Sequence, residues 1–422
     1  MKIMRAFLAG VCVVVVVAGC GKAPLGPVIA GGDKLYVAAS TRDSMQLAVI
    51  DSQSHSVVRS LALGTPSPDW THLYTVKASS LLDVDPHTGA VRHTLQLPGH
   101  FQLPPATISG VPGGLSQDGR WLVLEAFDSS PAAIPSATHL LVVDTSYGQP
   151  VRQVDLQGFF QFDAISNDGR RIYLIEYLSS SSYHVRFFDV GAGQLDPAVI
   201  FDKSDGSSAM AGVRLSGVAS PDGHWLYSVY ARSNKGAFIH ALSLDNPLAF
   251  CIDLPGSGYS SSQHEFHWSL ALSTDGSRLF AANGVMGVVA EVDTSTNGPR
   301  LMHTMRIDTT AASSNVVGQN VQAKELGPNG AVLSPDAKTL VVSGATGVMW
   351  IDTTSFRALG HQLADWRVWS LGLSPNGTML YAVNDSGMIA AMAMTGAHAA
   401  TTFTGAAGQP VALIRVEGAR VP

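Results

Sequence analysis

Two short segments combine side chains that could bind or transform a ligand. One is His264-Glu265-Phe266-His267-Trp268 and the other is Trp366-Arg367-Val368-Trp369. Imidazoles bind metal ions or carry protons near neutral pH, and carboxylates can act as bases. Aromatic rings beside a few charged groups are typical of pockets for sugars, peptides or planar molecules. The candidate ligand-binding residues in these segments are therefore His264, Glu265, His267, Trp268, Trp366, Arg367 and Trp369.

The two histidines do not by themselves indicate a metal site. Residues three apart in a regular strand face opposite sides of the sheet. His264 and His267 could therefore share an ion only if their segment is a loop. Nothing in the sequence identifies Glu265 as a general base. We predict no metal site, and the catalytic residues of any reaction stay unassigned.

Motifs of several familiar catalytic and cofactor sites are missing from the sequence. It has no Cys-x-x-Cys-His haem attachment, no Gly-x-Ser-x-Gly elbow, no Walker-type phosphate loop and no His-Glu-x-x-His zinc motif. The segment Val84-Asp85-Pro86-His87-Thr88-Gly89 faintly resembles a quinoprotein repeat, but it stands alone and lacks the docking tryptophans. We expect no cofactor.

The composition predicts a folded, strand-rich chain. Of the 422 residues, 46% are hydrophobic and only 14% are charged, the reverse of the balance in disordered proteins. The net charge of −6 excludes a strongly basic field for nucleic acid. The 42 glycines and 22 prolines, with many Val, Ser and Thr residues, indicate short strands joined by turns.

The N-terminus has the features of an export signal. Lys2 and Arg5 precede the apolar run 6–17, which is too short to span about 30 Å of hydrocarbon. The next residues, Val17-Ala18-Gly19-Cys20, resemble the lipobox of bacterial lipoproteins. This resemblance implies that Cys20 becomes the acylated first residue of a membrane-anchored chain. The alternative is an ordinary secretory peptide with an incidental cysteine.

The cysteines agree with export. Cys12 would leave with the signal and Cys20 would carry lipid, so Cys251 would have no partner for an intramolecular disulfide. Cys251 lies in an apolar, strand-like run, Ala249-Phe250-Cys251-Ile252. We expect it to be buried as a small hydrophobic residue rather than to serve as a reactive thiol.

One turn pattern recurs along the chain at intervals of roughly 49 residues. A Ser-x-Asp-Gly turn, or a close variant, precedes a strand of the Leu-Tyr-Val type. Asp-Gly between apolar runs is a strong hairpin signal, because glycine tolerates positive φ and Asp can bond its own backbone. After a truncated first copy at Gly32 to Val37, the turns begin at Ser67, Ser116, Ser166, Ser220, Ser273, Ser334 and Ser374.

A second landmark, an apolar pair followed by Asp, follows each of the first seven turns, as in Phe188-Asp189. Each unit therefore contains four short antiparallel strands. Such tandem units are the blades of a β-propeller. The sequence resembles YVTN-type and WD40-like bacterial propeller repeats, most closely at Leu333-Ser334-Pro335-Asp336 and Trp350-Ile351-Asp352-Thr353. We predict a signal peptide at 1–19, a linker at 20–30 and an all-β propeller at 31–422.

The first unit lacks an inner strand, because the segment before Asp33 is short and contains Pro24 and Pro27. The run 411–416 resembles an inner strand without a blade of its own. We therefore expect residues 411–416 to complete the first blade and close the ring. Eight blades follow from this count, and the alternative is seven blades with one degenerate unit.

Connections of variable length should lie on one face of the disc. In this topology the second-to-third strand connections and the links between units share a face. Long connections in compact domains are uncommon unless they are functional, which makes this face the candidate for function. The alternative is that inserts such as 128–138 are tolerated in the fold without having a function. Further residues expected near this mouth of the channel are Phe160, Phe162, Asp163, Arg214 and Glu325.

Two functions remain open. The first is a lipid-anchored, extracytoplasmic and monomeric propeller that binds a protein or cell-envelope ligand without catalysis and touches the membrane only through its lipid. The alternative is a lactonase-like or lyase-like propeller enzyme with carboxylates or histidines at the channel mouth. An alternative interpretation of Trp268 and Trp369 is that they pack between blades, since propellers need large side chains there.

Overall fold

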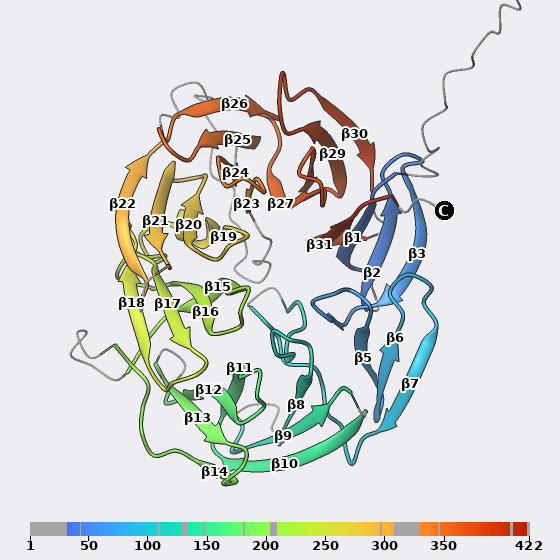
Figure 1. The fold of residues 1–422 in the computed structure, drawn as a ribbon, viewed down its shortest axis with the longest axis vertical. Coiled ribbons are helices and arrows are strands. Elements are labelled where there is room, and N and C mark those ends of the chain that lie inside the picture. The colour runs from blue at the N-terminus through green and yellow to red at the C-terminus, as the bar shows by residue number, and fades with distance from the viewer. Residues whose placement is uncertain are drawn as a thin grey trace, which may run out of the picture.

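Eight small antiparallel sheets form a closed ring around a central channel in the computed structural model (Figure 1). The structure describes residues 32–42, 44–107, 110–128, 134–146, 148–179, 182–202, 209–295, 298–307, 330–344, 347–405 and 408–419. The predicted all-β propeller with eight blades is therefore confirmed.

The first four blades run from the N-terminus to the middle of the chain. Blade 1 contains β1 (Lys34–Ser40), β2 (Met45–Asp51), β3 (Ser56–Ala62) and the C-terminal β31 (Gln409–Glu417). Blade 2 contains β4 (Thr65–Pro66), β5 (Leu73–Lys77), β6 (Ser80–Val84) and β7 (Val91–Gln96). Blade 3 contains β8 (Trp121–Phe127), β9 (Ala137–Asp144) and β10 (Gln149–Gln157). Blade 4 contains β11 (Phe160–Ile165), β12 (Arg171–Tyr177), β13 (Tyr183–Asp189) and β14 (Gln194–Leu195).

The remaining four blades complete the ring. Blade 5 contains β15 (Val213–Ala219), β16 (Trp225–Ala231), β17 (Phe238–Ser243) and β18 (Ala249–Asp253). Blade 6 contains β19 (Trp268–Leu272), β20 (Arg278–Asn283), β21 (Val288–Asp293) and β22 (Arg300–Arg306). Blade 7 contains β23 (Ala331–Leu333), β24 (Thr339–Gly344), β25 (Gly347–Asp352) and β26 (Ala358–Gln362). Blade 8 contains β27 (Val368–Leu373), β28 (Met379–Asn384), β29 (Met388–Ala393) and β30 (Ala400–Thr404).

The recurring turn is held by its own serine and carboxylate. In blade 4, the Ser166 hydroxyl donates to Asp168 Oδ1 at 2.6 Å and accepts from the Arg171 amide at 3.1 Å. Gly169 adopts φ 70°, which costs glycine little. In blade 6, the Ser273 hydroxyl and the Ser277 amide and hydroxyl lower the pKa of Asp275 to about 2. The motif is therefore a local structural device that reverses the chain between inner and second strands.

The ring closes as predicted. Strand β31 pairs antiparallel with β1, from Lys34 opposite Glu417 to Ser40 opposite Gln409. Leu413 and Val416 are buried against the residues of blade 8, and the Leu413 amide donates to Ser370 Oγ at 3.0 Å. The two ends of the chain thus share one blade.

Blade 3 departs from the four-stranded pattern. Its innermost segment pairs with β8 through isolated bridges only, at Leu115 opposite Leu122 and at Gln102 opposite Glu125. Pro104, Pro105 and Pro112 occupy this segment, and proline has no amide to donate to a ladder. The long connection before β8 therefore forms a loop near the channel instead of a regular inner strand.

The core lies between neighbouring blades. Trp350, Tyr36 and Phe280 are fully buried within such interfaces. Cys251 on β18 forms no disulfide among the described residues, has intermediate exposure and packs against one of these clusters, so the expected burial is only partial. Within the described residues, no helix has the length and apolar character needed to cross a membrane.

Candidate functional site

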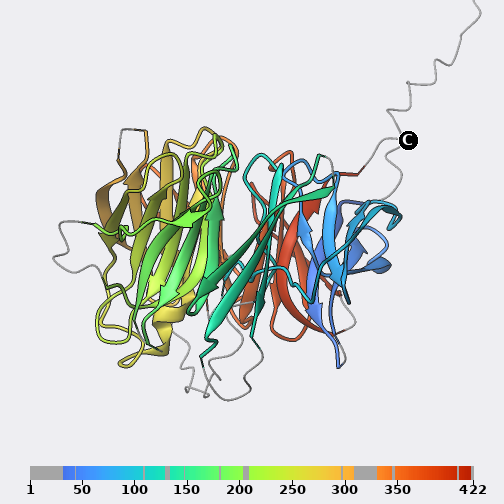
Figure 2. The same cartoon turned by 90° about the horizontal axis from the view of Figure 1, so that it is seen from below.

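The two faces of the disc differ in their connections. We call the face that carries the Ser-x-Asp turns the turn face, and the opposite face the loop face. The predicted site segments lie on the loop face, immediately before inner strands β19 and β27. Figure 2 shows the disc from the side, with the short helical turn of the loop face (yellow) at the bottom. The end of the described chain (red) lies near the top, on the side of the opposite face.

His264 and His267 lie on a 3₁₀ turn rather than on a strand or an irregular loop. This turn, η2, spans Gln263–His267 and is capped by Ser262, whose side chain accepts from the His264 amide at 3.2 Å. Residues three apart eclipse each other on a 3₁₀ helix, so both imidazoles share one side. No group of three potential metal ligands exists among the described residues.

Glu265 and Trp268, two of the predicted ligand-binding residues, are buried and hydrogen-bonded within the protein. Glu265 is 1% exposed, and its Oε1 accepts from the amides of Ser257 and Gly258 at 2.8 and 3.0 Å. The Trp268 indole is 1% exposed and donates to Glu265 Oε2 at 3.4 Å. The carboxylate therefore holds the preceding loop against the core instead of facing a ligand.

The tertiary structure brings His267 near Arg367, about 100 residues later in the chain. Burial, the Arg367 guanidinium and His264 together lower the pKa of His267 to about 4. His267 is thus neutral at physiological pH. His264 is exposed, whereas His267 and Arg367 are half-buried, so this corner of the loop face presents imidazoles beside one fixed positive charge.

The two tryptophans of the second segment differ in their roles. Trp366 is half-buried and packs against the core between blades 7 and 8, while its amide donates to the Leu363 carbonyl at 2.8 Å. Trp369 is half-buried and forms a β-bulge in β27. The bulge follows from the strand register, in which Val368 pairs with Asn384 and Ser370 pairs with Val383. A bulge redirects the side chain of the extra residue. Trp369 therefore lies outside the regular inward and outward alternation of β27.

Arg214 has a positioning role at the channel. Its guanidinium bonds the Asp163 carboxylate of blade 4, and its Nε donates to the Ala106 carbonyl at 2.6 Å. Ala106 belongs to the inserted hairpin, which comprises residues 104–107 and 110–113 of the connection before β8. The Gly113 amide donates to Pro104 O at 2.7 Å, and Thr65 of blade 2 donates to Gly113 O at 2.6 Å. Arg214 therefore secures this hairpin beside β15 near the centre of the ring (Figure 1).

Three buried polar residues near Arg214 and the predicted Asp163 were not singled out in the sequence: Tyr183, Tyr230 and His240. Asp163 sits at a bulge of β11, and behind the ion pair lie Tyr183, Tyr230 and His240, with ring centroids 6.0 Å apart for the two tyrosines. Tyr183 and His240 are 3% and 1% exposed. These residues occupy second and third strands with mostly apolar neighbours. The apolar pattern of those strands conceals their polar side chains, and only the packing of blade 4 on blade 5 assembles them.

Glu125 on β8 is another buried acid that the sequence did not single out. It is 1% exposed and its Oε2 accepts a long hydrogen bond, 3.5 Å, from the Phe162 amide. Burial raises the pKa of Glu125 from 4.5 to about 7. The folded protein therefore favours the protonated acid.

This pKa predicts a specific pH dependence. Between pH 4.5 and 7 the folded state holds a proton on Glu125 that the unfolded state releases, so the free energy of unfolding falls as the pH rises. The full loss is about 3 kcal/mol above pH 7. We expect Glu125→Gln to match the wild type at pH 5 and to be more stable at pH 8, measured by chemical denaturation. Parallel pH profiles of the two proteins would contradict the assignment.

Two predicted positions lie outside the described residues. They are Glu325, a candidate at the channel mouth, and Cys20, the candidate lipidation site. Of the other candidates, the structure groups His264, His267 and Arg367. It places Arg214 apart from them, at the inserted hairpin.

Comparison with known proteins supports the fold alone. No family model matches the chain, and no curated protein matches it. A solved dihydro-heme d1 dehydrogenase, NirN, is similar with a TM-score of 0.53 and 13% identity, over 90% of this chain and 74% of that one. The periplasmic gluconolactonase PpgL of Pseudomonas aeruginosa is similar with a TM-score of 0.45 and 18% identity, over 92% of this chain and 99% of that one. The β-propeller domain of Cps50 (Swd1) from Myceliophteria thermophila has a TM-score of 0.42 and 11% identity, over 76% of this chain and 91% of that one.

Proposed function

We propose that this chain is an extracytoplasmic, lipid-anchored propeller that binds a protein or cell-envelope ligand through its loop face without catalysis. The observation that carries this proposal is the position of the chain ends. Strand β1 begins and β31 ends at the turn face, where Lys34 pairs with Glu417. A tether at Cys20 would therefore leave the loop face directed away from the membrane.

The length of the tether fits this arrangement. Eleven residues separate Cys20 from Gly32, the first described residue. A fully extended segment of this length spans at most about 40 Å. Acyl chains on Cys20 would hold the turn face close to the bilayer, because each buried CH₂ contributes about 0.8 kcal/mol.

The chemistry of the loop face favours binding over catalysis. Neutral His267, exposed His264 and the Arg367 guanidinium offer hydrogen-bond donors to carbonyl, carboxylate or sugar oxygens. The carboxylate beside them, Glu265, is occupied by two amides and an indole. An enzyme of the lactonase type would need an available carboxylate or a metal at this position.

Photocrosslinking in intact cells tests the proposal. A photoreactive residue replaces Gln263 on the loop face, and the matched control replaces Lys338, whose side chain is 76% exposed on the turn face. We expect an adduct with a protein or envelope polymer from position 263 only, and a lower yield with Arg367→Ala. We also expect labelling by a tagged fatty acid in the wild type and none in Cys20→Ala.

Two outcomes would contradict the proposal. Adducts that form from position 338 but not from 263 would place the working surface on the turn face. Equal fatty-acid labelling of the wild type and Cys20→Ala would remove the lipid anchor.

A further inference from the structure

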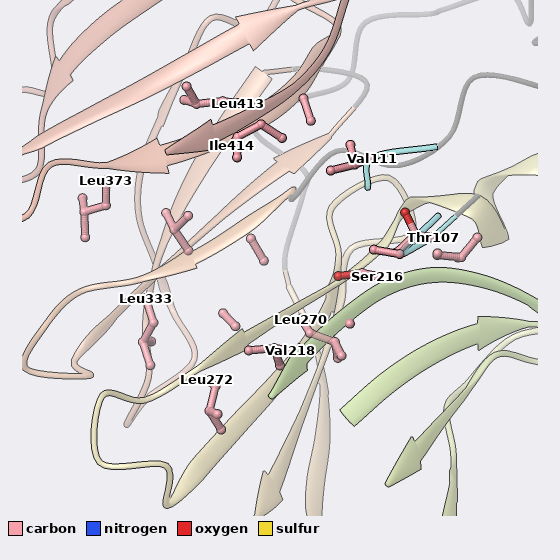
Figure 3. Close-up of a pocket in the computed structure, with 17 residues that line it drawn as sticks. Thr107, Val111, Ser216, Val218, Leu270, Leu272, Leu333, Leu373, Leu413 and Ile414 are labelled. Carbon is pink, nitrogen blue, oxygen red and sulfur yellow. The ribbon is translucent and has the colours of Figure 1, made fainter. Parts of the chain in front are cut away.

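The central channel contains a cavity of about 520 Å³. Its walls come from inner strands β15, β19, β23, β27 and β31 and from the inserted hairpin (Figure 3). Leu272, Leu333 and Leu373 line it, and each directly precedes the serine of a turn. The cavity therefore extends to the turn-face end of the channel, away from the histidines of the loop face.

The lining of this cavity is aliphatic. Among the 17 described residues that line it, none is aromatic or charged, and only Thr107 and Ser216 have polar side chains. In Figure 3 these two hydroxyls lie on one side, while Leu333 and Leu373 lie on the other. The volume falls in the range of small-molecule sites, about 300–1,000 Å³. Walls without aromatic rings suit an alkyl chain better than a planar ligand, which would gain from stacking.

A polar recess adjoins the aliphatic cavity. This second cavity, of about 160 Å³, shares Ala106, Thr107 and Gly217 with the first and contains Asp163 and Arg214. The Asp163 side chain is 1% exposed and that of Arg214 is 16% exposed. A guanidinium has five N–H donors in a fixed fork. Three of the five Arg214 donors bond the Ala106 carbonyl and the Asp163 carboxylate, so only the remaining N–H groups of the terminal nitrogens can donate to an oxygen-bearing head group in this buried recess.

We propose that the channel binds a single-chain amphiphile. The hydrocarbon chain occupies the aliphatic cavity, and the polar head group lies in the recess beside Asp163 and Arg214. The proposal goes beyond binding at the loop face, because it uses the opposite half of the channel. Only the source of the ligand depends on the proposed anchor. With the turn face toward the membrane, the chain comes either from a free membrane-derived amphiphile or from the acyl group of Cys20.

The test is calorimetric titration of the full chain carrying Cys20→Ala with octanoate, decanoate and laurate, without detergent. We expect one site per chain, with the dissociation constant falling about tenfold for each two added carbons. Absence of binding, or affinities that do not change with chain length, would overturn the proposal.

Blocking variants locate the site. Leu333→Trp fills the cavity and should weaken laurate binding at least tenfold. Its matched control is Leu359→Trp in outer strand β26 of the same blade, where Leu359 is 55% exposed, and this variant should bind normally. Leu373→Trp on blade 8 gives a second blocking variant, and thermal unfolding confirms that each is folded. Normal binding by folded forms of both blocking variants would overturn the channel assignment.

A final comparison identifies the source. Lipidated full chain in nanodiscs is titrated with laurate beside the Cys20→Ala chain in the same nanodiscs. Weaker binding by the lipidated form supports occupancy by its own acyl group, and equal binding supports a free amphiphile. Both arms are independent of the loop face, so failure of the photocrosslinking experiment would leave this result unaffected.

Discussion

Removal of residues 409–422 is expected to abolish the cooperative unfolding transition of the ring. Strand β31 is the only described partner on the inner side of β1 and forms seven residue pairs with it. Its loss exposes the β1 edge and the hydrophobic residues that Leu413 and Val416 cover in blade 8. Unpaired buried backbone groups cost about 1–3 kcal/mol each, whereas a whole domain is stable by about 5–15 kcal/mol. Calorimetry of the truncated chain measures the effect.

A milder variant keeps this prediction testable if the truncated chain does not fold. Leu413→Ala should lower the free energy of unfolding by about 2–5 kcal/mol, because Leu413 is 5% exposed. The matched control Leu359→Ala, at an exposed position, should change it by less than about 0.5 kcal/mol. Deletion of residues 21–28, which lie outside the described part, should leave stability unchanged. A truncated chain as stable as the full chain would mean that the ring closes elsewhere.

Breaking the Asp163–Arg214 pair is expected to have the second largest effect. Asp163→Ala leaves the Arg214 guanidinium buried without its counter-charge, which costs about 3–5 kcal/mol. The inserted hairpin should also become accessible to proteases, because Arg214 would no longer be oriented toward the Ala106 carbonyl. Urea denaturation and limited proteolysis measure the two consequences.

The double variant separates the pair from its environment. Asp163→Leu combined with Arg214→Met should lose less stability than the sum of the two single changes, because no unpaired charge remains. The control is Arg170→Ala, since Arg170 and Asp168 form an exposed pair at 4.0 Å that contributes about 0–1 kcal/mol. Asp163→Ala and Arg170→Ala with equal effects would show that Asp163–Arg214 is no more important than a surface pair.

Several inner strands of the ring contain β-bulges. Inner strands carry bulges at Asp163, in the Arg214–Ser216 stretch of β15, and at Trp369. A bulge moves a side chain out of the regular alternation without breaking the blade. The regular turns that hold each blade are repeated along the chain, whereas these bulges differ from blade to blade. The bulged residue of β11, Asp163, lines the polar recess, and the bulged residue of β15, Leu215, lines the aliphatic cavity.

The propeller fold could be predicted from the sequence. The Ser-x-Asp turn is a local structure, in which Ser374 Oγ bonds Asn376 at 2.7 Å and accepts from the Met379 amide at 2.9 Å. Because all of its partners lie within five residues, its spacing reveals the blades. The sequence also shows that the first unit lacks an inner strand and that the run 411–416 has no unit of its own. Closure of the ring was therefore predictable.

The sites were decided by the tertiary structure. Sequence alone chose Glu265 and Trp268 for their chemical types, but both are buried and bond each other. Neither Glu125, whose pKa rises because it is buried, nor the inserted hairpin beside Arg214 was indicated by the sequence. The Glu125 and Arg214 contacts join residues from different blades. Blade geometry follows from short-range hydrogen bonds that a linear pattern records, whereas burial and charge pairing in the channel depend on which blades face each other across the closed ring.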